Sequence, residues 1–179
     1  MDYPFIKTKR LILRPIIAGE SKQMYSGLAG KDRNSMVRFY GVEFHTLEDA
    51  QMHFEWFDTL LREQKGVWWG IGFHSKTEFL GACGFYNISK QHKKAEIEFW
   101  LMPDYWHQGI MTEALPNIIG YAFEELGIHR IETFIEVGNQ FSKELLLKIG
   151  FKHEGTMQDC KIKHGKLISI DIFAIIKPS

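Results

Sequence analysis

The chain has 179 residues, of which 45% are hydrophobic and 14% aromatic, so it is long enough to bury a core and too apolar to stay disordered. Lysine plus arginine (22) equals aspartate plus glutamate (22), which leaves no overall field that would attract nucleic acid or anionic lipid. No uncharged run reaches the length of a membrane span, and the first residues carry no signal-peptide pattern. We therefore expect one cytoplasmic domain over residues 1–179, without a nucleic-acid or membrane partner.

The first predicted element is a strand at residues 9–16, KRLILRPI. Leu11 and Leu13 share one face of this strand, and Pro15 stops it. Residues 18–28, AGESKQMYSGL, favour a short helix. The chain is therefore expected to begin with a strand followed by a helix.

The clearest helix start is the run Thr46-Leu47-Glu48-Asp49, a capping box in which the Thr46 hydroxyl accepts from a first-turn amide while the acid reaches back. An apolar stripe follows at steps of three and four and ends before Gly66. Its members are Leu47, Ala50, Phe54, Phe57 and Leu61. The stripe predicts a helix that packs on a flat apolar surface.

Two strand-like runs, residues 67–73 and 79–88, flank the polar turn HSKTE and predict an antiparallel hairpin. The next strand, AEIEFWL at residues 95–101, alternates between two faces. One face carries Ala95, Ile97, Phe99 and Leu101, and the other carries Glu96, Glu98 and Trp100.

A broad apolar stripe predicts a helix at residues 110–126, closed by Gly127, and residues 130–137 read as the next strand. Strand, helix and strand within about forty residues are typical of a parallel crossover. A short helix at residues 142–149 and two strands around the turn at 163–166 complete the chain. The sum is an α/β (α+β) domain, a mixed sheet with helices on its faces.

The loop WHQGIMTEAL, residues 106–115, joins a strand to the long helix, and Gly109 lies where one gives way to the other. Loops after a parallel strand often bind the ligand of an α/β sheet, and helix N-termini present unpaired amides to a phosphate. A glycine lets the backbone approach the phosphate without a Cβ in the way. The patterns GxxxxGK[ST], GxGxxG, HExxH and GxSxG are all absent, which argues against a kinase, a dehydrogenase, a metal hydrolase and a serine triad. No metal site is predicted.

The succession TKRLILRP, AEIEFWL, YWHQGIMTEAL, RIETFIEVGN and NQFSKELLLKIGFKHEG resembles the GNAT superfamily of acetyl-CoA-dependent N-acetyltransferases. Within it the chain is similar to the RimJ/RimL-like branch, which includes the ribosomal-protein alanine and serine N-terminal acetyltransferases. The likeness covers residues 8–176, nearly the whole chain. It implies the GNAT fold, a mixed, mostly antiparallel sheet splayed between its fourth and fifth strands, with acetyl-CoA in the cleft.

The resemblance implies that main-chain amides of the loop wrap the pyrophosphate of coenzyme A. The family pattern Q/R-x-x-G-x-G/A is met only at Gly109, although YW-x-x-G-x-x-TEA is a familiar form in the ribosomal branch. The implied cofactor-binding residues of the loop are His107, Gln108, Gly109, Ile110, Met111 and Thr112. In relatives the preceding strand has a bulge whose free amide polarises the thioester carbonyl. The matching cofactor-binding residues are Phe99, Trp100, Leu101 and Met102.

Asn139 and Ser142 match positions that, in relatives, touch the pantetheine arm or lie beside the sulfur. Many relatives also carry a tyrosine as the acid for the leaving thiolate, four residues before the glycine of the GF pair. That position holds Leu146 here. Ser142 is the substitute that we assign to this catalytic role.

An amine attacks only when it is neutral, so a carboxylate base is expected to act directly or through water. Glu96 and Glu98 share one face of a strand. Glu96 matches the AEI position that some relatives use as the base, so it is the first candidate and Glu98 the second. A solvated or ion-paired role without catalysis stays open for both. Trp68, Trp69 and Trp100 either wall the acceptor groove or simply pack.

The predicted reaction is direct transfer of acetyl from acetyl-CoA to a primary amine. The branch resemblance points to the N-terminal amine of a protein or peptide, with a polyamine, antibiotic or amino acid as the alternative acceptor. Residues 34–45 lie where relatives place an acceptor-binding loop, and what this loop selects stays open. A coenzyme-A-binding sensor without catalysis is the alternative from another class, because Leu146 and the phosphate loop depart from the family pattern. The resemblance also allows a homodimer.

Overall fold

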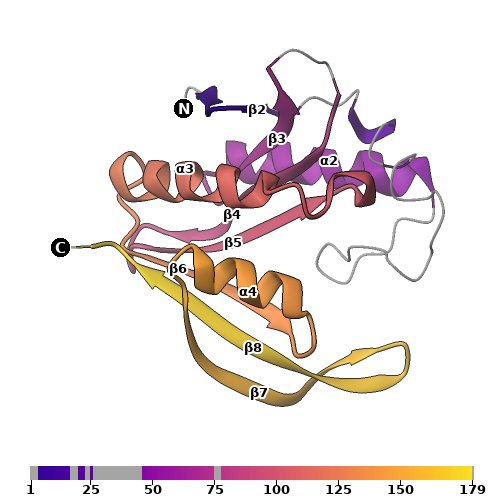
Figure 1. Ribbon diagram of the computed structural model, residues 1–179, viewed down its shortest axis with the longest axis vertical. Coiled ribbons are helices and arrows are strands. Elements are labelled where there is room, and N and C mark those ends of the chain that lie inside the picture. Colours follow the sequence, from indigo (N-terminus) through magenta and orange to yellow (C-terminus); the bar gives the residue numbers. More distant parts are fainter. Residues whose placement is uncertain (1–3, 17–19, 23–24, 26–45, 75–77, 179) are drawn as a thin grey trace.

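The described strands form one eight-stranded sheet in the order β1-β2-β3-β4-β5-β6-β8-β7 (Figure 1). The computed structural model describes residues 4–16, 20–22, 25, 46–74 and 78–178. The strands are β1 (Ile6–Lys7), β2 (Leu11–Pro15), β3 (Val67–Phe73), β4 (Gly81–Ser89), β5 (Lys94–Leu101), β6 (Arg130–Glu136), β7 (Lys152–Lys163) and β8 (Lys166–Ile176). Neighbouring strands are antiparallel except β5 and β6, which are parallel. The predicted mixed, mostly antiparallel sheet is confirmed.

Helices cover both faces of this sheet (Figure 1). They are α2 (Leu47–Arg62), the 3-10 helix η1 (Pro103–Tyr105), α3 (Ile110–Glu124) and α4 (Gln140–Lys148). On one face α3 and α4 enclose a core that includes Leu11, Ile97, Ile118, Leu146 and Phe173. On the other face α2 encloses a second core that includes Phe54, Phe57, Trp68, Phe79 and Trp100. Within the described residues, no helix combines the length and the apolar character that crossing a bilayer requires.

The strand predicted at 9–16 is present as β2, with Leu11 and Leu13 fully buried. The two other expectations for the N-terminal third fall largely outside the described residues. Of the helix predicted at 18–28, only four residues are described, and these are helical. The segment 34–45, expected as the acceptor-binding loop, lies outside the described residues.

The buried stripe of α2 differs by one position from the prediction. Leu60 is buried and Leu61 only half-buried, and His53 joins the stripe. The lack of solvation at this site lowers the pKa of His53 to about 4, so the imidazole is neutral at neutral pH. A neutral imidazole can be buried among aromatic rings, and Phe57 packs edge-on against His53 with ring centroids 4.6 Å apart. The predicted stripe contained only apolar residue types, so it did not include this histidine.

The capping box of α2 is present as predicted. Asp49 N donates to Thr46 Oγ1 at 3.1 Å, and Thr46 N donates to Asp49 Oδ2 at 2.8 Å. Replacing Thr46 with alanine is expected to lower the free energy of unfolding by about 1 kcal/mol, because a first-turn amide loses its acceptor. Urea denaturation measures the change, with Thr46→Ser, which keeps the hydroxyl, as the control. Equal stability of the alanine variant and the wild type would contradict the capping role.

β5 and β6 pair only briefly and then separate. Their parallel pairing covers three residue pairs, from Lys94 with Arg130 to Glu96 with Glu132. Both strands continue past the last pair, and Figure 1 shows them diverging. This is the splay that the resemblance implied, since the family's fourth and fifth strands correspond to β5 and β6 here. The chain leaves the divergent end of β5 to enter the loop before α3, so the opening faces the N-terminus of that helix.

The strand bulge expected at Phe99–Met102 is absent from the pairing of β4 with β5. The register runs without interruption from the Tyr86–Glu96 pair to the Gly81–Leu101 pair. The irregularity lies at the other end, after Tyr86. The expectation of a bulge was therefore wrong. In the described part of the chain, it is the divergence of β6 that leaves one edge of β5 without a neighbouring strand.

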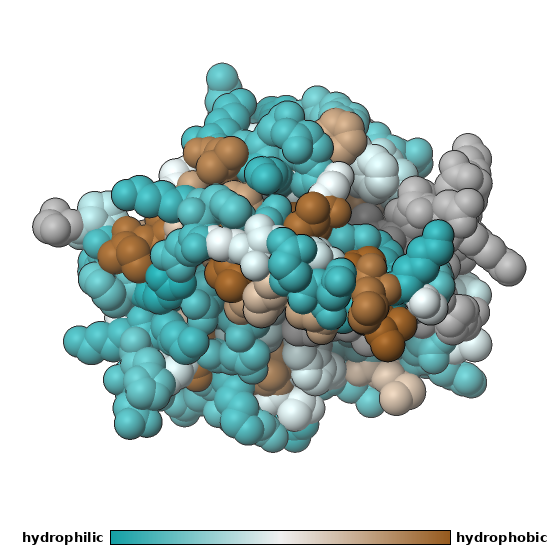
Figure 2. Space-filling view, turned by 90° about the horizontal axis from the view of Figure 1, so that it is seen from below, coloured by the Kyte–Doolittle hydropathy of each residue, from teal (hydrophilic) through white to brown (hydrophobic). Residues whose placement is uncertain are grey.

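The outer strand β7 presents a mainly hydrophilic surface. Figure 2 views the molecule from the side of β7 and β8 and shows polar groups with separate apolar patches. The exposed apolar side chains of these two strands are Met157, Ile162, Leu167 and Ile176. Lysines spaced along an outer strand, here Lys152, Lys161 and Lys163, discourage pairing with another sheet edge.

Candidate active site

The loop between β5 and α3 ends in a left-handed glycine. Gly109 has φ 71° and ψ 13° and is the N-cap of α3. Among the described residues, a Cβ at this position would meet only Nη2 of Arg10, at 3.7 Å. The position therefore needs glycine for its backbone conformation and not for lack of space. His107 also has a positive φ, 59°, so the chain turns sharply twice within three residues.

Side-chain contacts hold this loop on two sides. Trp106 Nε1 donates to the last carbonyl of β5 at 2.8 Å, and Gln108 Nε2 donates to Asp104 O at 2.9 Å. His107 packs edge-on against Phe141 of α4, with ring centroids 4.8 Å apart. The loop is therefore tied to the end of β5 and also to the helix on the other side of the opening.

The first turn of α3 offers main-chain amides rather than side chains. A helix start leaves its first N–H groups without helical partners, and a left-handed residue before a right-handed helix turns successive N–H groups toward one point. Such a concavity binds anions, aided by the helix dipole. The side chains of Ile110 and Met111 are buried in the core, so these residues can contribute only their backbone. Thr112 is half-buried, and its hydroxyl belongs to the same turn.

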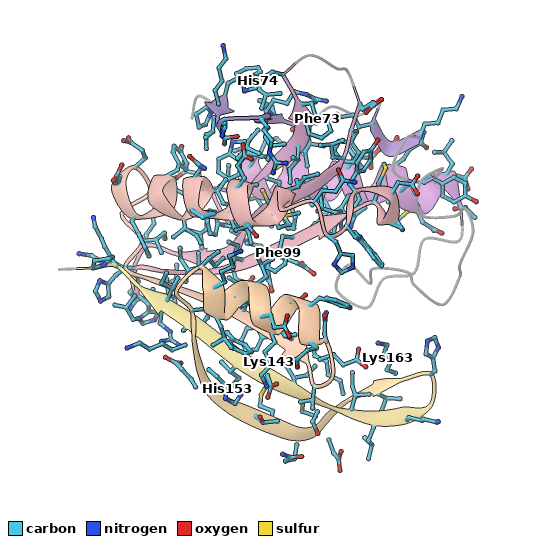
Figure 3. The ribbon with its side chains drawn as sticks, in the orientation of Figure 1. Phe73, His74, Phe99, Lys143, His153 and Lys163 are labelled. Carbon is cyan, nitrogen blue, oxygen red and sulfur yellow. The ribbon has the colours of Figure 1, made fainter. Side chains whose placement is uncertain are left out.

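Alternation along β5 decides which backbone groups face the opening. Met102 N donates to Leu80 O at 2.9 Å, which assigns the even-numbered residues to the β4 side. The backbone groups of Phe99 and Leu101 therefore face the opening toward β6. Figure 3 shows Phe99 between α3 and α4. Trp100 is nearly fully buried in the core beneath α2.

The two candidate bases share one face of β5, as the alternation predicted; the structure shows that this face is the one toward α2, and that the surroundings of the two carboxylates differ. The Glu96 carboxylate accepts from Asn87 Nδ2 at 2.9 Å and from the Tyr86 hydroxyl. Glu98 is half-buried. Burial raises the pKa of Glu98 to about 8 against the opposing positive charge of Lys161, and the negative charge of Glu96 adds to the rise. A carboxylate that titrates in this range is suited to accept a proton near neutral pH.

Asn139 and Ser142 form the N-terminal turn of α4. Asn139 is the N-cap, and its side-chain oxygen accepts from Ser142 N at 3.2 Å. Asn139 is exposed and Ser142 is half-buried. Leu146, at the position of the family tyrosine, is fully buried in the core. This chain therefore uses that position for packing.

Trp68 and Trp69 are core residues, with exposures of 1% and 0%. Trp68 packs on Phe57 of α2, with ring centroids 4.6 Å apart, and Trp69 packs edge-on against Tyr121 of α3 at 5.4 Å. Of the two alternatives left open for these side chains, packing agrees with the structure. Their contribution to the site is to hold the helices on either face of the sheet.

Sequence reasoning missed a network behind the phosphate loop. Glu113, in the first turn of α3, accepts from Thr8 Oγ1 at 2.5 Å, from Arg10 N at 2.7 Å and from Arg10 Nε at 2.6 Å. Burial alone would raise the pKa of Glu113, but these hydrogen bonds outweigh it and lower the pKa to about 2. Arg10 and Glu113 are 103 positions apart, so no local spacing could have linked them.

The sheet opens beside a helix N-terminus whose amides can bind an anion, an arrangement that suits the class of α/β proteins with an extended, phosphate-bearing ligand. A family model described as acetyltransferase (GNAT) domain matches residues 10–152, and the chain belongs to this family. GNAT acetyltransferases use acetyl-CoA. The chain is therefore an acetyl-CoA-dependent N-acetyltransferase.

Named relatives agree with this family, and a solved structure agrees with its fold. The uncharacterized N-acetyltransferase YoaA of Bacillus subtilis (strain 168) is 30% identical over 177 residues, which covers 98% of each chain. The ribosomal-protein-serine acetyltransferase of Escherichia coli (strain K12) is 27% identical over 99 residues, 55% of each chain. Mycobacterium smegmatis RimJ, solved in complex with CoA-disulfide, superposes with a TM-score of 0.85 at 19% identity and covers 96% of this chain and 86% of that chain. The last likeness concerns the fold alone.

The residues of this chain fit acetyl-CoA at two points. The left-handed Gly109 opens a turn of amides suited to a diphosphate. Beyond Glu96, the edge of β5 has no neighbouring strand among the described residues, so its backbone can pair with an extended arm. The two features lie at the same end of β5.

Proposed function

We propose that this enzyme acetylates the α-amino group at the N-terminus of a protein or peptide. The observation that carries the proposal is the divergence of β5 from β6 beside the start of α3, with the raised pKa of Glu98 at the edge of that opening. The name of the ribosomal-protein-serine acetyltransferase supports the same class of acceptor.

The loop and β5 together bind and orient the acetyl donor in this proposal. Amides from His107 to Thr112 hold the diphosphate, because they are the groups that the left-handed Gly109 turns outward. When bound, acetyl-CoA supplies an activated thioester. The backbone N–H groups of Phe99 and Leu101 point into the opening, where one of them can donate to the thioester carbonyl and stabilise charge that develops on it. The neighbouring Trp100 and Met102 support this edge through packing and pairing with the other side.

Glu98 takes the proton of the incoming amine. The α-amino group has a pKa of about 7.7–8.0 and a lysine side chain about 10.4. A carboxylate whose pKa is about 8 is therefore matched to an α-amine, and a transfer from lysine would be uphill. The neutral nitrogen then bonds to the carbonyl carbon while the carbon–sulfur bond breaks. The ammonium nitrogen loses two protons in all: the first ends on Glu98, and the second, released once the carbon–nitrogen bond has formed, passes to solvent, which returns one to the thiolate.

The departing thiolate needs a proton, and Ser142 is our candidate for its donor. Leu146 is buried and has no proton to give, whereas the half-buried Ser142 is one turn earlier in the same helix. Asn139 caps that turn and fixes its direction. Ser142 passes on a proton from solvent in this scheme, and its hydroxyl is restored after each turnover.

A matched set of acceptors tests the proposed function. A peptide with a free N-terminal serine and an internal lysine is compared with the same peptide N-terminally blocked, and with spermidine, by following thiol release from acetyl-CoA. We expect turnover only with the free N-terminus, and mass spectrometry should locate the acetyl group on the α-nitrogen. Turnover of spermidine or of the blocked peptide alone would replace the proposal with a small-amine or lysine acceptor.

A further inference from the structure

The β1–β2 hairpin presses its turn against the first turn of α3. Residues 8–10 form this turn, and both Thr8 and Arg10 donate to the Glu113 carboxylate. The Arg10 side chain is 43% exposed and that of Glu113 18%, so the ion pair is partly shielded from water. Figure 1 shows β2 on one side of α3 and α4 on the other. The hairpin therefore holds the phosphate loop from the side opposite α4.

Arg10 also fixes the direction of one peptide plane in the loop. Its Nη1 donates to Gln108 O at 3.1 Å. That carbonyl and the N–H of Gly109 belong to the same trans peptide, in which the two groups point in opposite directions. With the carbonyl held by Arg10, the Gly109 N–H points away from the β1–β2 hairpin and toward the side of α4. Anchoring the carbonyl thus aims an amide at the space where the diphosphate is expected.

Arg10 neutralises the negative charge of Glu113, which would otherwise repel the diphosphate of coenzyme A. The pKa of Glu113, lowered to about 2, keeps its carboxylate ionised at every physiological pH, and this carboxylate lies in the first turn of the helix that receives the diphosphate. A negative side chain there stabilises the helix but repels a second anion at the same end. The guanidinium of Arg10 contacts the carboxylate directly and offsets that repulsion.

We infer that Arg10 is a positioning residue for coenzyme A binding, which aims the Gly109 amide and neutralises Glu113 from behind the loop. The inference rests on the proposed placement of the diphosphate at residues 107–112. Among the described residues, none accepts a hydrogen bond from Nη2 of Arg10, which lies over Gly109. Thr8 and the Arg10 backbone still hold Glu113 when the guanidinium is removed, so the fold should survive its loss.

The test compares Arg10→Met, Glu113→Gln and the double variant, with Lys9→Met as a matched loss of charge from the same turn, where Lys9 is exposed. Calorimetry gives the affinity for coenzyme A, and thermal unfolding reports the fold. Arg10→Met should weaken binding about 10-fold or more, the size expected for one charge-assisted contact. Lys9→Met should stay within about 2-fold, as for an exposed charge that salt screens. Adding Glu113→Gln to Arg10→Met should recover part of the lost affinity.

A donor without the diphosphate separates positioning from general damage. With S-acetyl-pantetheine in place of acetyl-CoA, Arg10→Met should leave kcat/KM unchanged relative to the wild type, because the group that the loop orients is missing. An equal loss with both donors, or an affinity for coenzyme A within about 2-fold of wild type, would overturn the inference. A double variant no tighter than Arg10→Met would refute the charge balance.

The variant Gly109→Val tests separately whether the diphosphate binds at residues 107–112, on which the role of Arg10 rests. If Gly109→Val weakens coenzyme A binding and Arg10→Met does not, only the role of Arg10 is wrong. If neither variant changes the affinity, the diphosphate binds elsewhere and the placement itself is wrong.

Discussion

Replacing Glu98 with glutamine is expected to lower kcat by about 10²- to 10⁴-fold, the usual contribution of a general base. Wild-type activity should rise with pH and level off above about 8, because the base works only after it loses its proton at the pKa that burial gives it. The glutamine variant keeps the shape of the side chain and loses the contribution of Glu98 to this limb, so the rise that remains is that of the acceptor amine, with its pKa of about 7.7–8.0. Steady-state rates between pH 6 and 10, at saturating acetyl-CoA, measure both effects.

Glu96→Gln is the matched control, since it removes the same charge from the same face of β5 two residues away. Asn87 and Tyr86 already donate to the Glu96 carboxylate, so we expect a smaller loss of kcat and a retained limb near pH 8. A large loss in Glu96→Gln with normal activity in Glu98→Gln would reverse the assignment. It would restore the base that the family resemblance favoured.

Stability provides a check that Glu98→Gln is folded. The pKa of Glu98 is about 8 in the folded chain and near 4.5 when the residue is solvated, so the folded state holds the proton more tightly. The stability that comes from the neutral carboxyl is present below about pH 4.5 and is lost as pH rises through 8. Glutamine is neutral throughout. The variant should therefore unfold at a higher temperature than wild type at pH 9, and the difference should vanish at pH 4.

Local patterns in the sequence were enough to find most elements of the fold, although not the short strand β1 or the 3-10 helix η1. The alternation of β5, the capping box at Thr46 and the stripe of α3 each depend on residues a few positions apart, and each is present. The position of the opening followed from the family resemblance and not from spacing. The same resemblance predicted a bulge that is absent, because pairing of β5 with β4 depends on both strands and cannot be read from one.

The environment of the site could not be predicted from spacing. Glu96 and Glu98 lie on the same strand face in the sequence pattern. Their chemistry differs because Glu98 is more deeply buried near Lys161 of β7, whereas Glu96 accepts hydrogen bonds from Asn87 and Tyr86. The same holds for Arg10, whose partner Glu113 is contributed by a helix far along the chain. Leu146 departs from the family pattern in a way that a sequence shows but does not explain. Its full burial accounts for the departure, since a tyrosine there would have to displace core side chains.

Gly109→Val is expected to weaken coenzyme A binding by roughly 10- to 100-fold, because a β-branched residue is strained at φ 71° and the loop must change its conformation to relieve that strain. The change is one of backbone geometry, since the nearest described atom to a new Cβ is 3.7 Å away. The N–H groups that the left-handed residue turns outward would then no longer converge. Isothermal titration with coenzyme A measures the loss, and circular dichroism should show an unchanged content of helix and strand.

The variant Gly109→Asn distinguishes the loss of the left-handed backbone conformation from a steric clash between a new Cβ and the diphosphate. Asparagine adopts the left-handed region far more readily than valine, so the loop should keep its geometry and most of its affinity. If asparagine weakens binding as much as valine, the Cβ itself blocks the diphosphate, which would mean that the phosphate lies directly on Gly109. If neither variant changes the affinity, the loop does not hold the diphosphate. Glycine adopts the left-handed conformation of this N-cap without strain, whereas other residues do not. Unchanged binding in both variants would therefore show that this conformation is not needed to bind coenzyme A.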